Sequence, residues 1–282
     1  MIFAKLVSDI AKLWIKYNGA YLNGIKNTLI LALVGTFIGC VIGFLCGILN
    51  TIPVYKNDNP IKKVLLAILR VLIRVYVEVF RGTPMVLQAV FIYFGLPYFT
   101  SNAVQWSSVW ACAILVVSIN TGAYMAETVR GGILAIDRGQ TEGAKAIGMS
   151  HWQTMVNVIM PQVLKNILPQ IGNNFIINIK DTSVMFIISF TDFFAAHRAA
   201  VGATYLYFPS ATIEMIGYLT MTLIASFLLR WWEKKLAGST SYELATDDQL
   251  APTAGTLNSP LKGSNFDERN IEIKDGGNKY GK

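Results

Sequence analysis

Charged residues are scarce in this sequence. Only 15% of its 282 residues are Asp, Glu, Lys or Arg, whereas 53% are hydrophobic. A soluble domain normally carries about a quarter charged residues, so the composition indicates a protein that is embedded in a membrane. The net charge of +7 could suggest nucleic acid as a partner. However, the lysines and arginines flank apolar stretches and form no single basic face, which argues against a nucleic-acid-binding protein.

Cysteines and catalytic signatures are scarce too. Cys40, Cys46 and Cys112 all lie in apolar segments, which predicts packing residues and neither a disulfide framework nor a zinc site. The chain contains no GxxxxGK[ST] loop, so it is not expected to supply ATP hydrolysis. His151 and His197 are isolated in the sequence and are predicted to be surface histidines. The sequence therefore predicts a protein that is not an enzyme, with no catalytic residue, no metal site and no cofactor bound by this chain.

Long uncharged runs predict the membrane spans. Residues 28–49 contain no charge over 22 positions, which is enough to cross a hydrocarbon core of about 30 Å at about 1.5 Å per residue. Residues 82–126 are also uncharged and can hold two spans, divided near Pro97. The predicted fold class is all-α and integral to the membrane. Five spans are expected, at about residues 28–49, 80–98, 107–126, 166–190 and 210–229.

Both ends of the chain are more polar than the middle. Residues 1–21 carry apolar side chains on one face and lysines on the other, which predicts an interfacial amphipathic helix. Residues 237–282 are rich in small and polar residues, which predicts a disordered cytoplasmic tail. Five spans put the N-terminus outside and the C-terminus inside. The N-terminal lysines then oppose the positive-inside tendency, but the inverted topology would place the basic stretch 62–74 outside.

A glycine repeat marks the first predicted span. Glycine recurs at every fourth position, at Gly35, Gly39, Gly43 and Gly47. Such a ladder of small residues lets two helices approach closely. The partner helix could belong to a second subunit or to the same chain, and the sequence leaves both alternatives open.

A polar stretch between the third and fourth spans predicts two short helices joined by a turn. Asp137 can cap the first helix, with Gln140 in capping-box position. Gly148 is the residue expected just past a helix end, where a left-handed conformation is favourable for glycine. Ser150 and Gln153 form a second capping box. The stretch holds no nucleophile–base pair and no metal-ligand cluster, so it is predicted to be a docking device at the face of the membrane.

This polar stretch resembles the EAA loop of bacterial ABC importer permeases. The residues that align with the loop's motif are Glu142, Gly143, Ala144 and Gly148. In that family alanine usually stands where Gly143 stands here. Residues 78–84 and 180–183 resemble the polar amino acid branch of the same family, and the whole resemblance covers roughly residues 22–232.

The resemblance implies a fold, a function and partners. The fold is that of type I ABC importer permeases over residues 22–232, with a coupling loop at 137–160 that contains a short cytoplasmic coupling helix. The function is that of a permease subunit that moves polar amino acids across the bacterial cytoplasmic membrane. The implied partners are a second permease subunit, identical or related, two cytoplasmic subunits that bind ATP and Mg, an extracytoplasmic amino acid-binding protein and membrane lipid. An ion-gradient-driven secondary transporter or channel is the alternative, but it would leave the EAA loop without a role.

Polar residues within or near the spans form the predicted substrate pathway. An ion inside a membrane is costly and usually faces a cavity or a partner. Lys180 and Asp181 are therefore predicted either to contact substrate or to form structural pairs, for which Glu78 and Arg81 are the candidate partners. Neutral residues could line the same path or bond one helix to another. The predicted pathway residues are Glu78, Arg81, Thr83, Gln88, Asn120, Tyr124, Lys180 and Asp181.

Overall fold

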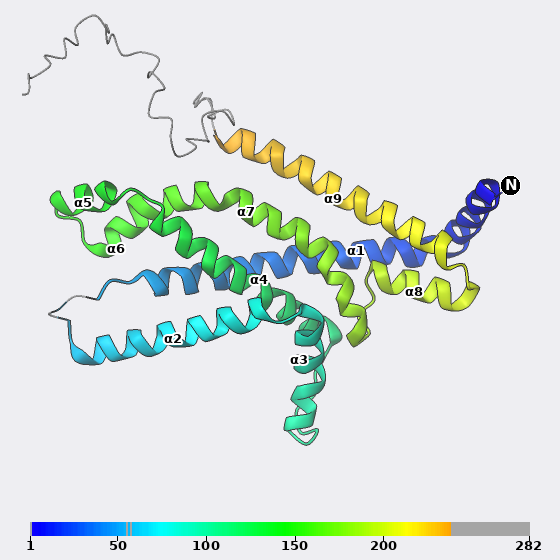
Figure 1. The fold of residues 1–282 in the computed structure, drawn as a ribbon, viewed down its shortest axis with the longest axis horizontal. Helices are drawn as coiled ribbons and strands as arrows, with labels where there is room; N and C mark the ends of the chain where they lie inside the picture. The colour runs from blue at the N-terminus through cyan, green and yellow to red at the C-terminus, as the bar shows by residue number, and fades with distance from the viewer. Residues whose placement is uncertain (1, 55, 57, 238–282) are drawn as a thin grey trace, which may run out of the picture. The chain divides into compact units, whose positions relative to one another are not determined.

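The computed structural model describes residues 2–54, 56 and 58–237 of the chain. All regular elements in this part are helices (Figure 1), which confirms the predicted all-α class. The predicted tail lies outside the described residues, except for residue 237.

The first four helices are α1 (Ile2–Thr51), α2 (Pro60–Gly82), α3 (Met85–Phe99) and α4 (Val109–Leu134). The polar loop forms α5 (Arg138–Ala146), α6 (His151–Thr154) and the π-helix η1 (Met155–Ile159). The remaining elements are α7 (Met160–Asp181), the 3-10 helix η2 (Thr182–Ile188), α8 (Phe193–Thr204) and α9 (Tyr207–Ala237).

One helix, α1, contains both the predicted amphipathic segment and the first predicted span. It continues over 50 residues without an end near residue 21. No proline occurs before Pro53 to remove a backbone donor. The amphipathic segment of α1 is anchored through Leu13 and Tyr21, which are buried in a core shared with α8 and α9.

The glycine ladder of α1 packs against α4. A Cβ added to Gly43 would come within 2.2 Å of the Cβ of Met125, and one added to Gly39 within 2.6 Å of the Cβ of Thr121. Added Cβ atoms at Gly35 and Gly47 would meet Val117 and Val129 in the same way. The ladder therefore serves packing within one chain, and this resolves the alternative that the sequence left open.

The described helices differ in how well they suit a membrane span. By length and composition α1, α4 and α9 qualify, and α7 with η2 and α8 would add a fourth span that bends by 52°. The second predicted span, residues 80–98, is divided between α2 and α3. Pro84 causes this break, because proline lacks a backbone N–H and disfavours a helical conformation of the residue before it. Thr83 is accordingly extended, with ψ 146°. The count of five spans remains a prediction.

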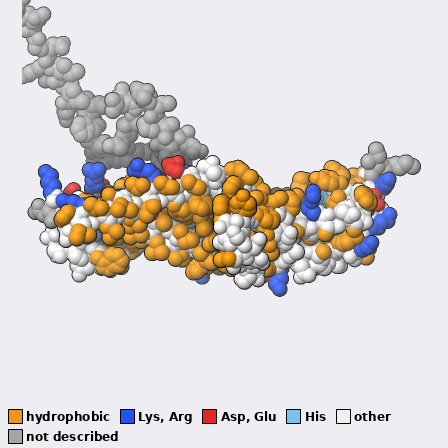
Figure 2. Space-filling view, turned by 90° about the horizontal axis from the view of Figure 1, so that it is seen from below, with side chains coloured by type: hydrophobic (Ala, Val, Ile, Leu, Met, Phe, Trp, Pro, Cys, Tyr) orange, Lys and Arg blue, Asp and Glu red, His pale blue; other side chains and the backbone are white. Residues whose placement is uncertain are grey.

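Hydrophobic side chains dominate the molecular surface. They cover much of the face drawn in Figure 2, whereas most Lys and Arg side chains lie toward its two ends. Large apolar side chains are also strongly exposed, among them Phe37 on α1 and Phe227 on α9, at 69% and 68% of their area. A contiguous apolar surface of this kind is expected where lipid or other membrane helices cover the protein.

A buried polar cluster joins α1, α8 and α9. The Tyr21 hydroxyl lies 2.7 Å from Ser210 Oγ, which in turn lies 2.9 Å from His197 Nδ1. Glu214 Oε2 is 3.6 Å from the same imidazole nitrogen. His197 is only 2% exposed, so the prediction of a surface histidine is wrong at this position. Its partners lie on α9 and are brought to it by the turn that follows α8.

Candidate transport pathway and coupling loop

The first short helix of the polar loop begins at Asp137. Its Oδ1 accepts a hydrogen bond from the Gly139 N–H at 2.6 Å, so the predicted cap is confirmed. The predicted capping box is wrong, because Gln140 does not return a bond to the cap. Its Oε1 accepts instead from Gln162 Nε2 on α7, at 3.3 Å. This contact ties α5 to the beginning of α7.

The turn between the two short helices has the predicted geometry. Gly148 has φ +83°, in the left-handed region that favours glycine. The N–H of Met149 donates to the carbonyl of Ala144 at 3.1 Å, as in a Schellman motif. Ser150 and Gln153 form the predicted capping box, with reciprocal bonds of 2.8 and 3.3 Å. The two helices are therefore held in a fixed arrangement by local hydrogen bonds.

The residues exposed on this loop are not the same set as the motif residues. Glu142, Gly143 and Gly148 are exposed, but Ala144 is 6% exposed and belongs to the inner face of α5. The sequence analysis missed two large exposed apolar residues, Ile147 at 80% and Trp152 at 69%. Exposed aromatic and aliphatic side chains of this size are typical of protein docking surfaces.

A polar pocket lies where α4 and α7 meet the break between α2 and α3. Its volume is about 290 Å³. Four predicted pathway residues line it, namely Thr83, Asn120, Tyr124 and Asp181. The sequence analysis missed Thr121, Asn174 and Asn178, which also line the pocket. The signal that could have found them is their recurrence at three- and four-residue steps in α4 and α7 (Thr121 with Tyr124, Asn174 with Asn178).

One side of the pocket is held by a network around Gln88. Its Nε2 donates to the carbonyl oxygens of Phe80 and Thr83, both at 2.9 Å. Asn120 Nδ2 donates to Gln88 Oε1 and to the Phe80 carbonyl, both at 3.1 Å. The helix break at Pro84 leaves such carbonyls without helical donors. Gln88 and Asn120 therefore stabilise the break, and Gln88 is a buried residue that lies outside the polar pocket.

The opposite side of the pocket is formed by buried asparagines of α7. Asn178 Nδ2 donates to Thr36 Oγ1 at 2.8 Å and to Thr121 Oγ1 at 2.9 Å. Asn174 Nδ2 lies 3.0 Å from the sulfur of Met125. Among the described residues, neither asparagine accepts a hydrogen bond at its side-chain oxygen. These oxygens can accept hydrogen bonds from a bound molecule.

The predicted charged residues do not gather at one place. Lys180 and Asp181 are both exposed, but only Asp181 lines the polar pocket. Within the described part of the chain, neither residue forms an ion pair, so the alternative of a structural pair with Glu78 or Arg81 has no support there. The Arg81 guanidinium lies over the ring of Tyr124, 5.4 Å from its centre. Glu78 lines a separate cavity of about 620 Å³.

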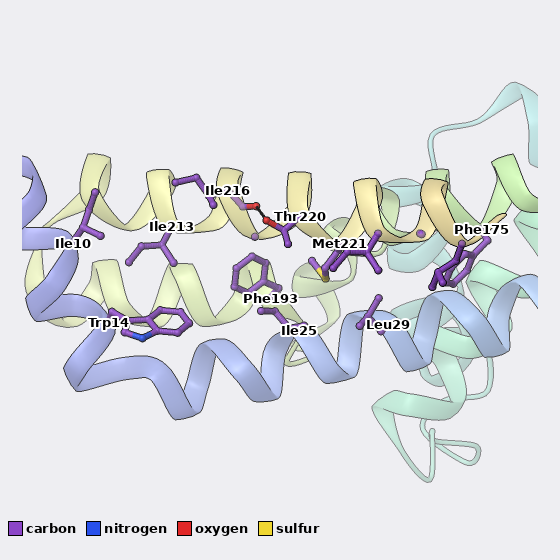
Figure 3. A pocket seen from close by; sticks show the side chains of 14 residues that line it. Ile10, Trp14, Ile25, Leu29, Phe175, Phe193, Ile213, Ile216, Thr220 and Met221 are labelled. Atoms are coloured by element: carbon purple, nitrogen blue, oxygen red, sulfur yellow. Dashed lines mark hydrogen bonds between the residues drawn. The ribbon is translucent and has the colours of Figure 1, made fainter. Parts of the chain in front are cut away.

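A cavity of about 640 Å³ between α1 and α9 has a different character (Figure 3). Side chains such as Trp14, Phe193 and Met221 point into it, and its surface is almost wholly apolar. It offers no charged group to a polar solute. The polar pocket, and not this cavity, is therefore the candidate transport pathway.

Comparison with known proteins places the chain in a family. Residues 64–238 match the family described as the inner membrane component of binding-protein-dependent transport systems. The chain belongs to this family. It is therefore a multi-pass protein of the plasma membrane and a transport subunit that works with partner subunits.

Individual relatives extend over most of the permease. It is 34% identical to the glutamine transport system permease protein GlnP of Escherichia coli (strain K12), over 76% of this chain and 92% of the relative. It is 38% identical to the arginine transport system permease protein ArtQ of Bacillus subtilis (strain 168), over 57% of this chain and 72% of the relative.

Two solved structures show the same fold. A crystal structure of an amino acid ABC transporter with histidines has a TM-score of 0.67 and 33% identity, and the match covers 78% of this permease and 96% of that chain. An inward-facing MetNI methionine ABC transporter has a TM-score of 0.58 at 20% identity, over 77% and 94% of the two chains. The expected permease fold is thereby confirmed.

Proposed function

We propose that this permease carries polar amino acids inward across the bacterial cytoplasmic membrane, as one subunit of an ATP-driven ABC importer. The glutamine and arginine systems of its relatives support this class of substrate, as does the likeness to a solved amino acid transporter. The observation that carries the proposal is the polar pocket, in which a single carboxylate, Asp181, faces neutral hydrogen-bonding groups.

The pocket suits the charges of an amino acid. A desolvated ammonium and a desolvated carboxylate each need a partner inside the membrane. Asp181 would accept the substrate ammonium. Arg81, held over Tyr124 at the edge of the pocket, would meet the carboxylate. Thr121 and the side-chain oxygens of Asn174 and Asn178 would bind polar groups of the substrate side chain.

The coupling loop would transmit the conformational change of the ATP-binding subunits to the membrane helices. In this proposal two cytoplasmic subunits hold ATP and Mg, and the exposed face of the loop docks on one of them. Glu142, Ile147 and Trp152 would supply the contacts, and the fixed turn at Gly148 would keep the loop rigid. A second permease subunit and an extracytoplasmic amino acid-binding protein would complete the importer, with the N-terminus of this chain outside and its C-terminus inside.

Uptake by the reconstituted complex tests the proposal. Proteoliposomes that contain this chain with ATPase subunits, a second permease subunit and a binding protein would be loaded with ATP and given labelled L-glutamine or L-arginine. We expect uptake that requires both ATP and the binding protein. Uptake by the permease alone, driven by a sodium or proton gradient without ATP, would instead show a secondary transporter.

A further inference from the structure

A second polar cavity lies apart from the pocket assigned to the substrate. It occupies about 620 Å³ between the end of α1, the middle of α2 and the end of α4. Unlike the polar pocket, it carries several charges of both signs. The charged residues that line it are Arg70, Arg74, Glu78, Glu127 and Arg130.

The order of residues along α2 and α4 places this cavity beyond the polar pocket. On α2, Glu78 of the cavity precedes Arg81, and Thr83 of the pocket follows it. On α4, the pocket residues end with Tyr124, and the cavity residues begin with Glu127. The contact between Arg81 and Tyr124 therefore lies between the two. In the proposed topology the cavity is on the cytoplasmic side of that contact.

The charges in the cavity are only partly neutralised by the protein. Arg130 and Glu127 form an ion pair at 2.8 Å. Arg70 donates from Nη2 to the carbonyl of Ile52, but its buried Nε has no hydrogen-bond partner. Arg74 and Glu78 form no ion pair with any residue that the structure describes. The cavity thus presents to an occupant the guanidinium of Arg74 and the carboxylate of Glu78, neither of which is ion-paired within the described residues.

This combination of charges selects a type of ligand. A metal ion would be repelled by the arginines, and phosphate by the two glutamates, whereas a zwitterion can satisfy both signs at once. We propose that this cavity is a second, cytoplasm-facing site for a free amino acid. The amino acid carboxylate binds Arg70 and Arg74, and its ammonium binds Glu78. The inference rests on the proposed function, because it places the site beyond the substrate pocket on the way to the cytoplasm.

Such a site would make import sensitive to its own product. An amino acid that accumulates inside would occupy the cavity and oppose release from the pocket beyond Arg81 and Tyr124. The net rate of import falls in proportion to the fraction of cavities that hold product. This effect needs no change in the ATPase subunits. Import should therefore slow as the internal amino acid concentration rises.

Protection of a cysteine tests binding directly. Leu134 lines the cavity and is 65% exposed, so Leu134→Cys gives a maleimide target there, with the unsubstituted protein as background. The full complex in phosphatidylcholine nanodiscs would be labelled with and without L-glutamine or L-arginine. We expect one of these amino acids to at least halve the labelling rate.

A matched pair of arginine variants identifies the contact. Adding Arg74→Gln should raise the half-protecting concentration about tenfold, which corresponds to the loss of one charge-assisted hydrogen bond. Arg230→Gln makes the same change at an exposed arginine outside the cavity and should leave protection unchanged. If Arg74→Gln does not accumulate, Arg74→Lys should weaken protection to a smaller extent, since it keeps the charge but loses the planar fork.

Tests with other ligands, and the transport assay, can give results that would overturn this site. Protection by acetate or inorganic phosphate as strong as that by the amino acids would overturn the zwitterion site. So would protection that arises from phosphatidylglycerol in the nanodisc, because the cavity would then bind a lipid headgroup. Normal ATP-driven uptake with no protection would sink this inference alone, whereas absent uptake would sink the proposed function. In uptake assays, internal amino acid should slow the wild type more than Arg74→Gln.

Discussion

The backbone of Gly43 on α1 packs directly against the backbone and Cβ of Met125 on α4. A Cβ on Gly43 would come 2.2 Å from the Cβ of Met125 and 2.8 Å from its carbonyl carbon. Because backbone atoms are involved, rotation of one side chain could not make room. The close approach of α1 to α4 therefore requires glycine at this position.

We expect Gly43→Val to lower the free energy of unfolding of the permease by about 3 kcal/mol or more, the upper end of the range typical of overpacking. Thermal melting in detergent and membrane abundance would measure the loss. Gly19→Val is the control on the same helix, because an added Cβ at Gly19 meets nothing within 4 Å. Equal melting temperatures for the two variants would contradict the packing of α1 against α4.

Gln88→Met should destabilise the break between α2 and α3. The Phe80 carbonyl would keep the donor from Asn120, but the Thr83 carbonyl would lose its donor from Gln88, and an unsatisfied polar group costs about 1–3 kcal/mol. Denaturation in detergent should show this loss, while uptake per folded molecule is retained. Gln162→Met removes an amide that bonds Val158 and Gln140 near the coupling loop, and it should be milder because Gln140 is exposed. A larger effect at Gln162 would contradict the role given to Gln88.

Gly148→Val should impair both transport and the stimulation of the ATPase subunits by substrate. A β-branched residue is strained at φ +83°, which costs about 1–3 kcal/mol and would displace the turn. Substrate-stimulated ATPase activity of the reconstituted complex should fall together with uptake. Gly143→Ala is the matched control, since its Cβ meets nothing within 4 Å and alanine favours the helix by about 1 kcal/mol. Normal stimulation in Gly148→Val would remove the coupling role from this turn.

Asp181→Asn should impair uptake without loss of protein from the membrane. The substrate ammonium would lose one charge-assisted bond, about 1.5–3 kcal/mol, which predicts a KM raised about tenfold to a hundredfold. Abundance should be unchanged, because Asp181 forms no ion pair within the described residues. Asp9→Asn makes the same chemical change at a residue of α1 that lies outside the pocket and should have no effect on uptake. Unchanged uptake in Asp181→Asn would exclude this carboxylate from the pathway.

Labelling from the two sides of the membrane tests the topology. An impermeant maleimide should reach Gln105→Cys, an exposed position between α3 and α4, only from outside. It should reach Gly143→Cys, in the coupling loop, only from inside. Reaction of both positions from the same side would contradict a span between them and with it the proposed orientation.

The sequence alone determined most local features of this protein, although Gln140 bonds Gln162 of α7 in place of its own helix cap. The cap at Asp137, the left-handed turn at Gly148 and the box formed by Ser150 and Gln153 depend on residues within a few positions of one another. Such bonds form in any context that lets the helices begin and end there. The apolar runs likewise determined the all-helical membrane class, because only helices or closed barrels satisfy the backbone within lipid.

Only the tertiary structure decided which residues from distant segments meet. Periodicity revealed the glycine ladder but not that Met125 faces Gly43. It also could not place Glu78 in a different cavity from Asp181, because the two residues lie on α2 and α7, which are far apart in the sequence. His197 was misjudged for the same reason, since its partners Ser210 and Glu214 lie on the next helix. Contacts between helices depend on how the helices cross and rotate, and a single helix does not encode its neighbour's position.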